Sequence, residues 1–257
     1  MVCMSRPRSA CRDPVGDAAQ AASYNMQMTG SDSLDGFLDK WRERWPEWSL
    51  VERFVAPELH RRSLAWFALL QEFDDMLNIA GDPLPANAKL GWWGEELRSW
   101  AAQRSRHPLG RVLEPVRGAP WAQLAEALPA LIDAREPVAD AAQARRSLQG
   151  FAEAVAAVEA VMFAAPLHPH AADAVLIQTL AQRVQELDAT VVPAKAGGVR
   201  EWQQALLAQW PARVAGPRPR RVYAALARGR LQACLRGGDY QPSPAGLLWR
   251  AWWAARG

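Results

Sequence analysis

The sequence predicts an all-α protein, and three observations lead to that prediction. Apolar residues recur with the i, i+3, i+4, i+7 spacing of a helix face, proline opens most of the apolar segments, and no segment alternates as a strand does. The predicted helices differ in length and repeat with no fixed period, which argues against a solenoid. At 257 residues with 50% hydrophobic residues, the chain is long enough for one domain with a large core.

The segment from Pro57 to Gly81 predicts the helix around which the chain is organised. Pro57 suits the first helical position, and Gly81 suits the position just after the last turn. Residues Ser63–Leu70 are apolar almost all round, which is typical of a buried helix. The polar residues that follow form one stripe, at i, i+3, i+4 and i+7: Gln71, Asp74, Asp75 and Asn78. Because an unpaired buried carboxylate is costly, we expect this stripe to face solvent or a polar cavity.

Residues 1–30 show no helical periodicity and lack the apolar segment of a signal peptide. We interpret them as a disordered extension and residues 31–257 as the folded domain. Ser31 or Ser33 is expected to cap a first helix that ends at Trp45.

The other predicted helices follow in order, and most of them begin at a proline. They span Pro57–Ala80, Pro85–Gln103, a segment from Pro108, Pro120–Arg135, Pro137–Ala165, Pro169–Leu187, Arg200–Gln209, Arg220–Leu235 and Ala245–Ala255. Asp188–Val199 contains a proline and two glycines, so we interpret it as a loop.

The predicted helix Pro85–Gln103 has one firm apolar face. Leu90, Trp93, Leu97 and Trp100 form that face at i, i+3, i+7 and i+10, so they are expected in the core. Trp92 lies to the side of this face. Glu95, Glu96 and Arg98 are expected on the side that faces solvent.

The composition limits which cellular compartment and which binding partners we expect. Three cysteines at unrelated spacings form neither a disulfide framework nor a C-x-x-C metal site, which favours a reducing, cytoplasmic compartment. No apolar run is long enough to span a membrane. The net charge is +3, but residues 200–257 carry ten arginines against two acids, Glu201 and Asp239. Such an end suits phosphates, diphosphates or an anionic membrane surface, or is a solvated cationic face, and no nucleic-acid partner is expected.

The last predicted helix mixes tryptophan with arginine. Trp249, Trp252 and Trp253 lie close to Arg250 and Arg256. Because this mixture suits a membrane–water interface, we expect the end of the chain to associate with anionic lipid. The protein would then be a peripheral one at the inner face of a membrane.

Several segments in a matching order resemble the squalene/phytoene synthase family. They are VAPELHRR with LAWFALL and the acidic stripe after it, KLGWWGEELRSW followed by RHPLGRVL, LPALIDAREP, and VVP ahead of the Arg-rich end. The resemblance covers Phe37–Gly257 and implies the isoprenoid (terpenoid) synthase fold, a single all-α bundle around a deep, apolar central cavity. Members of that family join two prenyl diphosphates head to head through a carbocation, with Mg²⁺ at the diphosphates.

The resemblance also assigns roles to the polar stripe. The family holds Mg²⁺ between two Asp-x-x-x-Asp motifs on facing helices. In the first motif Asp74 matches the first position and Asn78 replaces the second aspartate, which leaves an oxygen but removes a charge. Asp74 and Asp75 are therefore the candidate catalytic residues, and Asp74 with Asn78 is the candidate, weakened metal site. The alternative is a solvated or salt-bridged stripe with no catalytic role.

The second motif is poorly matched. Counting back from the VVP segment by the family's spacing reaches Leu180 and Val184, which are apolar. The helix instead carries glutamines, which are poor Mg²⁺ ligands beside carboxylates. The candidate substrate-binding residues are Arg61, Arg62, Gln71, Gln178 and Gln182. For the two arginines, pairing with Glu58 or with solvent is the alternative.

Three functions are left open by the sequence. The first is a squalene/phytoene synthase-like protein that has lost part of the metal machinery but binds a prenyl lipid or diphosphate, like the complex I assembly factors of the same broad family. The second is a working Mg²⁺-dependent prenyltransferase with an altered site. The third is a helical interaction scaffold, which a large apolar cavity between the Pro57–Ala80 and Pro169–Leu187 helices would exclude.

Overall fold

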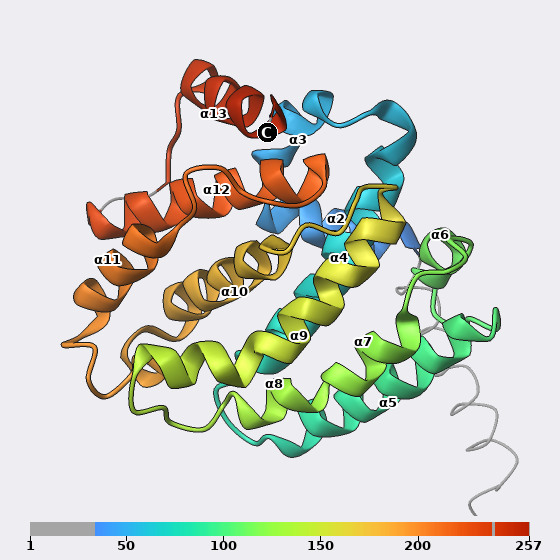
Figure 1. The fold of residues 1–257 in the computed structure, drawn as a ribbon, viewed down its shortest axis with the longest axis horizontal. Coiled ribbons are helices and arrows are strands. Elements are labelled where there is room, and N and C mark those ends of the chain that lie inside the picture. The colour runs from blue at the N-terminus through green and yellow to red at the C-terminus, as the bar shows by residue number, and fades with distance from the viewer. Residues whose placement is uncertain (1–33, 238–239, 257) are drawn as a thin grey trace, which may run out of the picture.

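The computed structural model describes residues 34–237 and 240–256, and every regular element in those ranges is a helix (Figure 1). The predicted all-α class is therefore confirmed. The α-helices are α2 (Leu34–Arg44), α3 (Trp48–Val51), α4 (His60–Leu77), α5 (Leu84–Ala101), α6 (Gly110–Leu113), α7 (Trp121–Ala127), α8 (Pro129–Asp133), α9 (Ala141–Met162), α10 (Ala171–Leu187), α11 (Val199–Gln209), α12 (Arg218–Leu235) and α13 (Pro244–Arg256). The 3₁₀ turns are η1 (Glu52–Phe54), η2 (Pro57–Leu59) and η3 (Asp188–Val191). The segment 1–30, predicted to be disordered, and the predicted caps Ser31 and Ser33 lie outside the described residues.

Helix α4 is central to the fold, as its sequence predicts. Its side chains are buried without a break from Ser63 to Asp74. It packs against α2, α5, α6 and α8. Because a helix with no solvent face needs apolar partners on every side, the other elements are arranged around it.

The second half of the chain forms a row of neighbouring helices. Helix α9 packs against α10, α10 against α12, and α12 against α13, which lies at the edge of the molecule (Figure 1). On the other side of α9, helix α7 packs against both α9 and α5. None of the helices in the described ranges has the length and apolar character that crossing a bilayer requires.

Two segments are more broken than their periodicity predicts. The segment Pro120–Arg135 forms two helices, α7 and α8, with Pro129 as the first residue of α8, because proline has no N–H to continue the preceding helix. The helix expected from Pro108 is a single turn, α6. Leu128, between α7 and α8, keeps right-handed helical backbone angles, so α8 follows directly on from α7.

The start of α9 is set by a side-chain cap rather than by proline. A helix was predicted from Pro137, but α9 begins at Ala141. The Asp140 carboxylate accepts a hydrogen bond of 2.9 Å from the backbone N–H of Gln143, which satisfies one of the free donors in the first turn.

The apolar face of α5 is confirmed, but one residue of its predicted solvent side is wrong. Trp93 and Trp100 are buried, whereas Trp92 is 39% exposed. Glu96, which we expected in solvent, is fully buried. Its Oε1 accepts hydrogen bonds from the Trp100 indole (2.8 Å) and from the backbone N–H groups of Arg106 (2.6 Å) and His107 (2.7 Å).

The hydrogen bonds to Glu96 explain why a carboxylate is tolerated there. Burial opposes its ionisation, but the donated bonds from the backbone of His107 and Arg106 outweigh burial, so the pKa of Glu96 is lowered. This carboxylate therefore fixes the turn after α5 to the helix itself.

We predict that truncation of Trp93 or Trp100 to alanine lowers the free energy of unfolding by about 3–5 kcal/mol, the range for a large aromatic removed from a packed core. Trp92→Ala, one residue away and partly exposed, is the control and should cost less than half as much. Urea denaturation measures all three. Equal costs at positions 92 and 93 would show that this face is not core.

Candidate functional site

The predicted polar stripe of α4 lies where α2, α4 and the end of α10 meet, and the protein's own cations occupy it. Asp75 accepts hydrogen bonds from Lys40 Nζ (3.3 Å) and Gln71 Nε2 (2.8 Å). Arg44 lies 3.7 Å from Asp75 and forms a second ion pair, with Glu186 of α10. Arg44 therefore links a carboxylate of α4 to one of α10.

Asn78 also contacts α10. Its Nδ2 donates a hydrogen bond of 2.7 Å to Glu186 Oε2, while its carbonyl oxygen is buried and has no hydrogen-bond partner among the described residues. In the sequence Glu186 lies beyond Leu180 and Val184, the positions of the family's second motif. In space it is nonetheless the acid of α10 that meets the stripe.

Asp74 differs from its neighbours because it is buried, with 7% of its surface exposed, and unpaired. No described residue forms a hydrogen bond or ion pair with its carboxylate. Burial, and then the nearby charges of Glu186 and Asp75, raise the pKa of Asp74 well above its usual value, although Arg44 and Arg220 act in the opposite direction. Asp74 therefore retains its proton to a higher pH than an ordinary aspartate.

These residues do not fit a Mg²⁺ site in the arrangement found. Within the described residues, no three acidic, histidine or cysteine side chains converge as metal ligands. Mg²⁺ needs ionised carboxylates, but burial raises the pKa of Asp74, and Arg44 neutralises the acids beside it. The amide of Asn78 is committed to Glu186 through its nitrogen.

On α10, the two positions of the family's second motif are part of the core, and the glutamines beside them make polar contacts within the fold. Leu180 and Val184 are buried. Gln178 Oε1 accepts a hydrogen bond of 3.0 Å from Arg220 Nη1, and Gln182 Nε2 donates one of 3.0 Å to the Tyr223 hydroxyl. Gln178 and Gln182, the predicted substrate-binding glutamines, are therefore bonded to side chains of α12.

The centre of the bundle contains a buried ion pair that sequence reasoning missed. Arg220 of α12 and Glu159 of α9 have side chains only 2% and 1% exposed. Arg220 Nε lies 2.9 Å from Oε1 and 3.1 Å from Oε2 of Glu159, and its Nη2 bonds to the same carboxylate. The Trp66 indole of α4 donates a further bond of 2.8 Å to Glu159.

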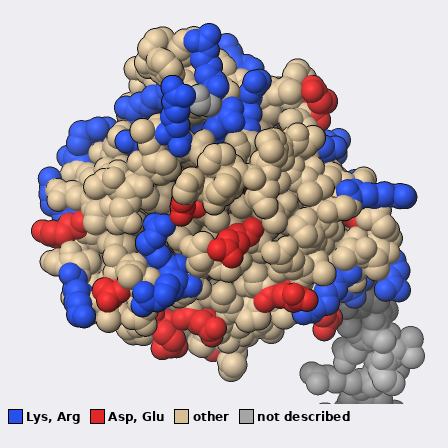
Figure 2. Space-filling view, viewed as in Figure 1, with Lys and Arg blue, Asp and Glu red and all other residues tan. Residues whose placement is uncertain are grey.

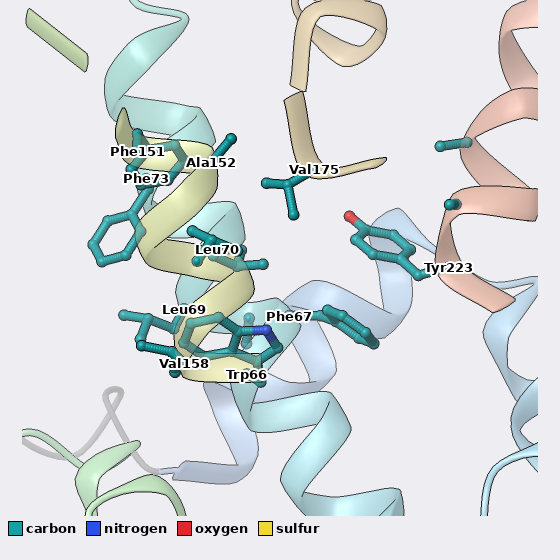
Figure 3. Packing of buried hydrophobic residues seen from close by; sticks show 14 of the residues in the cluster. Trp66, Phe67, Leu69, Leu70, Phe73, Phe151, Ala152, Val158, Val175 and Tyr223 are labelled. Atoms are coloured by element: carbon teal, nitrogen blue, oxygen red, sulfur yellow. The ribbon is translucent and has the colours of Figure 1, made fainter. Parts of the chain in front are cut away.

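Aromatic rings enclose the same guanidinium. Its carbon lies 5.6 Å from the ring centroids of both Phe67 and Tyr223, within the range of a cation–π contact. The two rings are 4.5 Å apart and lie side by side in the close view of the core (Figure 3). The pair is therefore bonded on one side and covered by aromatic rings on the other.

As a result, almost no space is left between α4 and α10. The cavity there has a volume of about 10 Å³ and is bordered by Asp74, Gln182, Arg220 and Tyr223. A single water needs roughly 10–15 Å³, so the space holds one water at most. The deep apolar cavity that the family resemblance implies is not open at this place.

The two predicted substrate-binding arginines are far from the stripe. Arg61 is exposed, 3.8 Å from Asp35, and Arg62 donates a hydrogen bond of 3.1 Å to the carbonyl of Met162. Twelve residues separate Arg62 from Asp74, which is roughly 18 Å along a helix. Glu58 does not pair with either arginine in the described residues.

One signal in the sequence could have identified Glu159. It lies in an alanine-rich helix, four residues after Val155 and three before Met162, on the face whose apolar residues are buried. The other acid of the helix, Glu153, lies six residues earlier and on a different face. An isolated acid on an apolar helix face predicts a buried, paired carboxylate. Its partner, Arg220, was visible only as one arginine of a basic end.

We predict that Arg220→Met lowers the free energy of unfolding by about 3–5 kcal/mol, because it leaves the Glu159 carboxylate buried without its counter-charge. The double variant Glu159→Leu/Arg220→Met removes both charges and should recover most of that loss. Chemical denaturation of the wild type and both variants measures the difference. A double variant less stable than Arg220→Met would contradict this account of the pair.

Asp74→Asn should stabilise the protein at pH 8 by roughly 1–3 kcal/mol, because it replaces a buried, unpaired carboxylate charge by a neutral amide. The folded state holds the Asp74 proton more tightly than the unfolded chain does, so its stabilising contribution is present at low pH and is lost as pH rises through the folded-state pKa. The gain should therefore vanish near pH 4. Urea denaturation at both pH values measures it, with Asp75→Asn as the ion-paired control that gains nothing. A loss of stability in Asp74→Asn at pH 8 would contradict the prediction.

Comparison with known proteins adds no assignment to this geometry. No family model matches the chain, and neither a curated protein nor a solved structure matches it significantly. The resemblance to squalene/phytoene synthases therefore depends on the sequence segments quoted above and enters the functional argument only as a proposal.

Proposed function

We propose that this chain is a non-catalytic helical protein of the squalene/phytoene synthase type that acts by binding a partner, as an interaction or assembly factor. The observation that supports this most directly is the Arg220–Glu159 pair, which lies where the resemblance would put a prenyl cavity. A buried, fully bonded pair is costly to break, so this centre does not open readily for a hydrocarbon chain.

The electrostatics of the stripe support the same proposal. Departure of a diphosphate needs its charge neutralised, and in the family carboxylate-bound Mg²⁺ does this. Here Lys40 and Arg44 already neutralise Asp75 and Glu186, and burial raises the pKa of Asp74. Each 1.4 kcal/mol of lost transition-state stabilisation slows a reaction tenfold, so a site without its metal cage loses many orders of magnitude.

A working Mg²⁺-dependent prenyltransferase is the second candidate, and one observation favours it. Glu186 brings a carboxylate from α10 to the acids of α4, although the family's motif positions on α10 are apolar. Arg44 would have to leave Asp75 and Glu186 before they could hold a metal ion, and the core around Arg220 would have to open for the substrate.

One experiment distinguishes the non-catalytic protein from the working prenyltransferase. The purified protein is incubated with farnesyl or geranylgeranyl diphosphate and Mg²⁺, and the lipids are then extracted. We expect no head-to-head product. If squalene or phytoene forms, Asp74→Ala abolishes it and Asp82→Ala does not, the second candidate is correct. Asp82 is the matched control because it is an exposed acid just beyond the end of α4.

A further inference from the structure

A groove of about 450 Å³ lies between α12, α13 and the loop that precedes α12. Four arginines line it together with two tryptophans: Arg213, Arg221, Arg228, Arg250, Trp210 and Trp253. No acid is among the described residues that form its walls. Lys and Arg side chains are seen to gather over this end of the molecule (Figure 2). The groove is therefore strongly cationic with an apolar lining.

The arginines of the groove differ in what they already bind. Arg221 is committed to the fold, because it donates hydrogen bonds to the carbonyls of Ala254 (2.9 Å), Ala255 (2.8 Å) and Gly216 (2.9 Å). Arg228 Nε, in contrast, is buried and has no hydrogen-bond partner among the described residues. A buried N–H without an acceptor is costly, so an anion in the groove would stabilise it.

No carboxylate in the described part of the chain forms an ion pair with Arg213, Arg228 or Arg250. Arginine presents its N–H groups in a planar fork that matches the oxygens of a phosphate. The chemistry of the groove therefore suits a phosphate group better than it suits a neutral or cationic ligand.

The surface of α13 indicates where that phosphate comes from. Leu247, Ala251 and Ala255 are buried against the rest of the protein, whereas Trp249 and Trp253 are 59% and 53% exposed. Indole rings are favoured at the interface between lipid and water. Trp253 is both an exposed ring and a wall of the groove, so a bilayer that receives the rings would present its headgroups to the arginines.

We propose that this groove binds the phosphate group of an anionic phospholipid while the tryptophans of α13 enter the membrane interface. The basic end of the chain would then have a defined binding site. Lipid binding in this groove goes beyond the proposed function, since it does not depend on whether the chain catalyses a reaction. A free phosphate would use the same arginines but would gain nothing from exposed indoles.

Sedimentation of the full-length protein with vesicles tests this. We expect binding to phosphatidylcholine vesicles that contain phosphatidylglycerol, and much weaker binding to phosphatidylcholine alone. Arg213→Gln/Arg228→Gln should weaken the binding about tenfold or more, since each basic residue near an anionic surface contributes to affinity. Arg218→Gln is the control, because Arg218 is an exposed arginine at the start of α12 that does not line the groove, and it should weaken binding less than the groove variant does.

Trp253→Ala should weaken vesicle binding without changing the net charge. Matching unfolding midpoints of wild type and variants establish that each variant is folded. Equal binding to neutral and anionic vesicles, or a loss in Arg218→Gln as large as in the groove variant, would overturn the proposal. Binding of inorganic phosphate that depends on Arg228, with no vesicle binding, would overturn the assignment to a lipid.

Discussion

One buried charge pair, Arg220 with Glu159, joins the helices at the centre of the structure. A guanidinium and a carboxylate removed from water are tolerated only when nearly every donor and acceptor is bonded. Here Glu159 bonds to Trp66 and Arg220, and Arg220 also bonds to Gln178. These residues belong to α4, α9, α10 and α12. Four helices from three separate parts of the chain are therefore held at a common centre, and that centre is filled.

The arginines of helix α12 point in different directions, and each direction gives the arginine a different partner. Arg220 points into the core, and Arg230 pairs with Glu47 and lies 3.7 Å from the centroid of the Trp45 ring. Arg221 bonds to carbonyls in the last turn of α13, where a helix has acceptors without intrahelical donors. Arg228 lines the groove. Arg220 therefore fills the interior, while Arg228 contributes to a cationic surface beside exposed tryptophans.

In the acidic stripe of α4, as in α12, the surroundings of each charged side chain decide how its charge is balanced. The carboxylates of the stripe are near one another, and the fold resolves their repulsion in two ways. Asp75 and Glu186 stay paired with Arg44, while Asp74, which has no cation in contact, is buried in a site that raises its pKa. A set of acids that resembles a metal site in the sequence is thus balanced by basic side chains.

The sequence by itself determined the helices and the faces that would be buried. The spacing of Leu90, Trp93, Leu97 and Trp100 and the starts at proline are local properties, and they act over a few residues. The sequence could not determine which charged side chains would pair with one another. Arg220 lies 61 residues from Glu159, and Arg44 lies 142 residues from Glu186. Glu96 was misplaced for the same reason, because its donors come from the turn after the helix. Only the tertiary structure decided which charges would meet, because the energy of a buried charge depends on neighbours that the folded chain supplies.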